Sequence, residues 1–186
     1  MHFYKKIQFL FPLMLVAVSP VAAEETSSET QAMKSMQHVL KRAEVVRLLA
    51  AEHLNYLEGE GATADVRMME DGAEVMAFSL ICDSAGLDPK MLNRIAAEAT
   101  MKIALKVETS PIKDRMTQIM GDMRPEDRLN LVADVSSTAL MFKIGRRRGL
   151  FDALLTDFGT GRFCRGMGGA IKKRYNDLAE FLKDEG

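Results

Sequence analysis

The chain has 186 residues, enough for one domain with a substantial core. Its formal net charge is −1, with 25 Lys and Arg against 26 Asp and Glu, which argues against a dedicated nucleic-acid-binding protein. It has no Trp and only 6% aromatic residues. Because sheet proteins usually carry more aromatic and β-branched residues, the composition favours helices.

Residues 1–23 have the pattern of a secretory signal peptide. Lys5 and Lys6 precede an apolar run over residues 7–18, and small residues at 21–23 form a cleavage pattern. The alternative is a membrane anchor, but a spanning helix needs about 20 apolar residues and this run is shorter. We therefore expect a periplasmic or secreted protein of a bacterial envelope, which is not an integral membrane protein after cleavage.

Residues 24–30 are acidic and rich in Ser and Thr, and we expect a disordered lead-in there. Helix signals then fill residues 31–186, which we interpret as one domain. The first predicted helix runs from Gln31 to Glu58 and ends at glycines. Apolar residues recur along it every three or four positions, as on one face of a helix. This face comprises Val39, Ala43, Val46, Ala50, His53 and Leu57.

The next three helices have clear start signals. Thr63 is a predicted N-cap for the second helix. We expect the C-terminal end of this helix to be buried on all sides. Asp88 followed by Pro89 begins the third helix, since proline fits the first helical position. A short fourth helix follows Ser110-Pro111.

The last part of the chain contains a fifth helix from Pro125 to a predicted end at Gly145. A short segment over residues 150–158 and a final helix over residues 162–183 follow. The prediction is a single all-α bundle of about five to seven helices.

The only two cysteines, Cys82 and Cys164, lie in the exported part. An even pair in an oxidising compartment indicates a disulfide, whereas a redox or metal pair would favour C-x-x-C spacing. Closing so long a loop stabilises the fold by roughly 4 kcal/mol in the chain-entropy model. Glycines after Cys164 predict a close approach of the second helix to the last, near the disulfide.

The sequence assigns no catalytic residue and no cofactor. The motifs of metalloproteases, nucleotide-binding loops, serine hydrolases and EF-hands are absent. His53 lies on an apolar helical face and is interpreted as a core residue. Carboxylate pairs such as Glu58/Glu60 are typical of solvated helix ends. A helical hydrolase whose cleft cannot be recognised in the sequence stays an alternative.

Met33, Met36 and His38 form a second candidate site near the mature N-terminus. Thioether and imidazole ligands suit Cu(I), so a periplasmic copper-binding protein is an alternative function. Methionine also fills gaps in helical cores, which is the competing interpretation.

Arg146, Arg147 and Arg148 are consecutive, and we predict that they lie in a loop between helices. Like charges repel, so such a loop favours an anionic partner, although a solvated helix face is the plainer interpretation. The leading hypothesis is a non-enzymatic binding or accessory protein. It would contact an envelope protein or an anionic envelope component through a surface.

Overall fold

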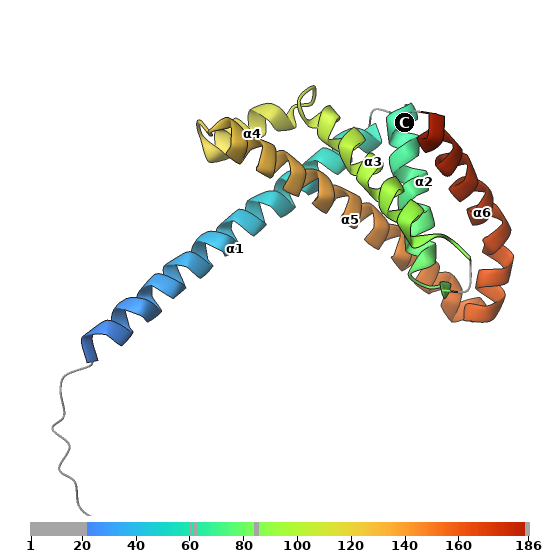
Figure 1. Ribbon diagram of the computed structural model, residues 1–186, viewed down its shortest axis with the longest axis horizontal. Coiled ribbons are helices and arrows are strands. Elements are labelled where there is room, and N and C mark those ends of the chain that lie inside the picture. The colour runs from blue at the N-terminus through green and yellow to red at the C-terminus, as the bar shows by residue number, and fades with distance from the viewer. Residues whose placement is uncertain (1–21, 60, 62, 84–85, 185–186) are drawn as a thin grey trace, which may run out of the picture. The chain divides into compact units, whose positions relative to one another are not determined.

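The regular structure of the protein is entirely helical in a computed structural model that describes residues 22–59, 61, 63–83 and 86–184 (Figure 1). Within these ranges there are six helices and no strand, which confirms the all-α prediction and its range of five to seven helices. The helices are α1 (Ala22–Gly59), α2 (Ala64–Ser79), α3 (Pro89–Val107), α4 (Ile112–Met120), α5 (Pro125–Phe158) and α6 (Thr160–Asp184).

The predicted signal peptide falls almost wholly outside the described residues and stays a prediction. No described helix holds an apolar stretch long enough to cross a membrane. Residues 24–30, predicted to be disordered, are helical and belong to the first turns of α1. The chain divides after Leu40 into two units, and the second contains the bundle.

The predicted start signals at α2, α3 and α4 are confirmed. The Thr63 hydroxyl accepts the backbone N–H of Val66 at 3.3 Å, and the Asp88 carboxylate accepts that of Lys90 at 3.0 Å. The Ser110 hydroxyl accepts the N–H of Ile112 at 3.3 Å. Each of these bonds satisfies a donor that the first helical turn leaves without an intrahelical partner.

The predicted end of the fifth helix at Gly145 is wrong, because α5 continues to Phe158. The glycines that do sit beside helix ends, such as Gly121 and Gly159, have positive φ angles of 69° and 72°. Gly145 is not among the positive-φ glycines of the described chain. A glycine in ordinary helical geometry costs only about 1 kcal/mol relative to alanine, which packing of the helix can offset.

The core of the bundle surrounds α2, which lies between α3 and α6 and also contacts α5 (Figure 1). Its largest fully buried side chains come from every helix of the bundle: Leu49, Leu54, Met69, Phe78, Ile95, Ile103, Met116, Leu131 and Ile171. His53 is fully buried, as predicted, and its Nε2 donates to the carbonyl oxygen of Ile103 at 3.1 Å.

Some residues predicted to face inward are exposed. Val39 and Ala43 on α1 both contact solvent, whereas Val46 begins the buried part of the α1 face. Helical spacing identifies one face of a helix but does not say how far along that face a neighbour covers it.

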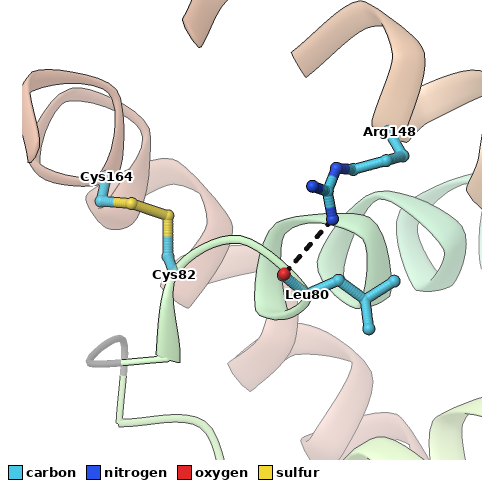
Figure 2. The surroundings of a disulfide bond; sticks show 4 residues. All are labelled: Leu80, Cys82, Arg148 and Cys164. Carbon is cyan, nitrogen blue, oxygen red and sulfur yellow. Dashed lines mark hydrogen bonds between the residues drawn. A yellow bond between two sulfur atoms is a disulfide. The ribbon is translucent and has the colours of Figure 1, made fainter. Parts of the chain in front are cut away.

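The disulfide between Cys82 and Cys164 is confirmed, with the two Cα atoms 5.8 Å apart (Figure 2). Cys82 follows the end of α2, and Cys164 lies in the first turns of α6. The bond therefore ties together two helices that are distant in the sequence and adjacent in the core.

Candidate functional site

Arg146, Arg147 and Arg148 lie within α5, so the predicted inter-helix loop is wrong. Arg146 Nη1 lies 2.9 Å from both carboxylate oxygens of Glu58. Arg148 donates from Nε to Asp152 at 2.9 Å and from Nη1 to the Leu80 carbonyl oxygen at 3.3 Å (Figure 2). Successive helical residues point about 100° apart. The three arginines therefore do not form one patch, and two of them hold the bundle together.

Lys143 is the centre of an ion-pair cluster that links three helices. Its Nζ lies 2.8 Å from Glu58 on α1 and 3.0 Å from Glu70 on α2, and the lysine itself is buried on α5. Arg146 supplies a second cation to Glu58. A buried charge costs free energy unless it is paired and hydrogen-bonded, and here it is both.

Glu58 makes the stability of the bundle depend on pH. Burial raises the pKa of its carboxyl, but the hydrogen bonds and charges of Lys143 and Arg146 outweigh this, and the pKa lies below the ordinary value. The unfolded chain therefore takes up this proton at a higher pH than the folded chain. The stabilisation by Glu58 is complete at pH values above the pKa that its carboxyl has in the unfolded chain. It is lost as the pH falls through the lower pKa that the carboxyl has in the folded chain.

We expect Glu58→Gln to lower the free energy of unfolding by about 1–2 kcal/mol at pH 7, with a difference that shrinks in acid. Urea denaturation at pH 7 and at pH 3 measures this. Glu180→Gln, at an exposed glutamate of α6, is the control and should change little at either pH. An equal loss at both pH values would contradict the proposed role of the carboxylate.

The predicted copper ligands are not brought together by the fold. Met33, Met36 and His38 are exposed residues of α1. Helical geometry places the two methionines roughly 60° apart around the axis, but His38 about 200° from Met36. In the part of the chain that the structure describes, no group of three His, Cys, Asp or Glu residues could hold a metal ion.

A hollow of about 430 Å³ lies between α1 and α4, lined by two carboxylates, Glu52 and Asp114, together with Tyr56 and Arg115. Arg115 Nε lies 3.7 Å from the Glu52 carboxylate and balances its charge. Asp114 is exposed on the rim. A general acid at neutral pH needs a carboxyl that is shielded from water, whereas both of these carboxylates are in contact with solvent.

The first half of α6 presents an exposed surface of one charge. We call Arg162, Arg165, Lys172 and Lys173 the basic face; all four are exposed, and none forms an ion pair within the described part of the chain. No Asp or Glu occurs between Thr160 and Asn176. The neighbouring Arg174 differs, because it binds Glu74 at 2.9 Å and Asp71 at 3.5 Å on α2.

A second hollow, of about 360 Å³, lies at the basic face beside the disulfide. We call it the disulfide hollow. Its lining comprises Phe78, Cys82, Cys164, Arg165, Gly168, Gly169 and Lys172. The volume falls within the range of about 300–1,000 Å³ that small-molecule sites have.

The glycines of α6 border open space and not a neighbouring backbone. A Cβ added at Gly166, Gly168 or Gly169 would meet nothing within 4 Å. The end of α2 packs against α6 beside the disulfide, as predicted, but these glycines do not make that contact. Each glycine costs the helix about 1 kcal/mol relative to alanine, and no contact with another described residue requires its small size.

Three exposed apolar residues lie on the end of α5 that leads into α6. Leu150, Leu154 and Phe158 follow one another at four-residue steps along one side of the helix, and Phe158 is 52% exposed. Gly159 joins the two helices directly. The apolar stripe thus ends two residues before the helix that carries the basic face begins.

Comparison with protein families, with curated proteins and with solved structures finds no match for this chain. The assignment of a function therefore depends on the surface and the hollows described above.

Proposed function

We propose that the protein is an exported, non-enzymatic accessory protein of the bacterial envelope that binds an anionic membrane surface through the basic face of α6. The observation that carries this proposal is the group of four exposed cations on a part of α6 that has no Asp or Glu between Thr160 and Asn176. This surface replaces Arg146–Arg148, whose charges are largely used within the fold.

Physical chemistry supports a membrane as the anionic partner. A Lys or Arg close to an anionic lipid surface contributes about 1 kcal/mol of binding free energy. Apolar side chains beside such a patch can enter the boundary between headgroups and acyl chains. Leu150, Leu154 and Phe158 are exposed at the end of α5 that leads into α6 and would supply this second contribution.

We expect the exported protein to sediment with vesicles containing phosphatidylglycerol but not with vesicles of phosphatidylcholine alone. Arg165→Glu/Lys172→Glu should weaken this binding more than ten-fold, because two attractive charges become repulsive. Added salt should weaken the binding of the wild-type protein, since exposed charges are screened.

The control is Lys34→Glu/Lys41→Glu, which changes the net charge equally at exposed lysines of α1. It should retain most of the binding. An equal loss in both variants would indicate that net charge alone matters, and equal sedimentation with both vesicle types would refute the membrane proposal.

A further inference from the structure

We infer that the disulfide hollow is a binding site for an amphipathic anion, with its anionic head between Arg165 and Lys172 and its apolar part against Phe78 and the disulfide. This inference rests on the proposed function and adds a ligand class to it. The basic face would then bind single anionic molecules as well as a surface.

The floor of the disulfide hollow is apolar and rigid. Phe78 is only 1% exposed, and its ring centroid lies 5.8 Å from that of Phe163 on α6. The disulfide fixes the end of α2 against α6 (Figure 2), and both of its cysteines line the hollow together with Phe78. A lining of Phe, Cys and Gly residues is mainly apolar and favours a ligand with an alkyl or aryl part over a fully hydrated anion.

The glycines keep the disulfide hollow open. Gly168 and Gly169 lie between Arg165 and Lys172 in the sequence of α6, and both line the hollow. Larger side chains at these positions would project into free space, since no atom lies within 4 Å of an added Cβ. The protein therefore gives up helix stability here without a packing reason, which is the pattern expected at a functional site.

The charges select an anion. Arg165 and Lys172 are seven residues apart, so they lie on the same side of α6, about 10 Å apart along its axis. Among the described residues, no carboxylate lines the hollow; Asp83 follows Cys82 but is exposed and is not part of the lining. A carboxylate or phosphate head can therefore bind without competition from an acidic side chain.

Titration calorimetry with dodecanoate below its micelle concentration tests the inference. We expect one molecule to bind per chain, while inorganic phosphate and dodecyltrimethylammonium do not bind. Gly168→Leu fills the hollow without changing the charge and should weaken dodecanoate binding at least ten-fold. Gly166→Ala, on the same helix but outside the lining, is the control and should bind as the wild type does.

A measurement on the wild-type protein keeps the test independent of whether Gly168→Leu folds. A diazirine-bearing dodecanoate analogue should label the peptides that contain residues 78–82 and 164–172, as mapped by mass spectrometry. Labelling elsewhere, or unchanged dodecanoate binding by folded Gly168→Leu, would overturn the inference.

The vesicle assay separates this inference from the proposed function. If Gly168→Leu loses dodecanoate but still binds phosphatidylglycerol vesicles, the hollow takes free amphipathic anions. If it loses both, the site holds a lipid molecule of the membrane itself. Vesicle binding without any dodecanoate binding would overturn the hollow as a site and leave the membrane proposal standing.

Discussion

Removal of the Cys82–Cys164 disulfide is expected to lower the free energy of unfolding by about 4 kcal/mol. The bond closes a loop of 82 positions in the unfolded chain, and in the chain-entropy model this loop length sets the size of the effect. The loss would be a large fraction of the stability of a domain of this size, which is typically about 5–15 kcal/mol. Guanidinium denaturation of the wild-type protein and of Cys82→Ser/Cys164→Ser measures the difference.

Two comparisons make this expectation specific. Reductant should shift the denaturation midpoint of the wild-type protein and leave that of the double variant unchanged. If the double variant is as stable as the oxidised wild type, the disulfide contributes nothing and the loop-closure argument fails. The double variant should also bind dodecanoate more weakly, since the disulfide forms part of the hollow.

Local signals in the sequence predict most of the helix boundaries. Thr63 and Asp88 cap their helices because a side-chain oxygen close in the sequence can always reach the free N–H groups of the first turn. Such hydrogen bonds depend on a few consecutive residues and not on the rest of the fold. The disulfide could also be predicted from the sequence, because two cysteines allow only one intramolecular pairing.

The error at Gly145 shows where local signals are insufficient. Glycine is favoured after a helix because it adopts positive φ, yet it also fits within a helix at a modest cost. Ile144 and Phe151 on either side are buried, so packing holds α5 together through the glycine. Only knowledge of what covers these two residues distinguishes a helix end from a helix interior.

The candidate surface could be found only in part from the sequence. The arginines and lysines in the last third of the chain can be counted in the sequence, but which of them form ion pairs depends on the tertiary structure. Arg146 lies 2.9 Å from Glu58 and Arg174 lies 2.9 Å from Glu74, with partners more than 80 positions away in both cases. Because these residues are paired with other helices, Arg165 and Lys172 are the exposed cations beside the hollow.

Phe78→Ala is expected to lower the free energy of unfolding by about 3–5 kcal/mol. Truncation of a buried phenylalanine loses its transfer free energy and leaves a cavity. Phe78 also begins a chain of aromatic contacts, since Phe163 lies 5.8 Å from it and 5.2 Å from Phe151 between ring centroids. These contacts connect α2, α6 and α5, so the substitution weakens three helices at once.

Phe158→Ala provides the matched control, because the same truncation is made at a ring that is 52% exposed. We expect a loss below about 1 kcal/mol there, and weaker binding to phosphatidylglycerol vesicles because an apolar membrane contact is removed. Thermal denaturation and vesicle sedimentation of both variants therefore separate two roles of aromatic residues in this chain. A loss of stability at Phe158 as large as that at Phe78 would show that the end of α5 is buried in solution. The apolar stripe would then not be available to a membrane, and only the cations of the basic face would remain as the proposed membrane-binding surface.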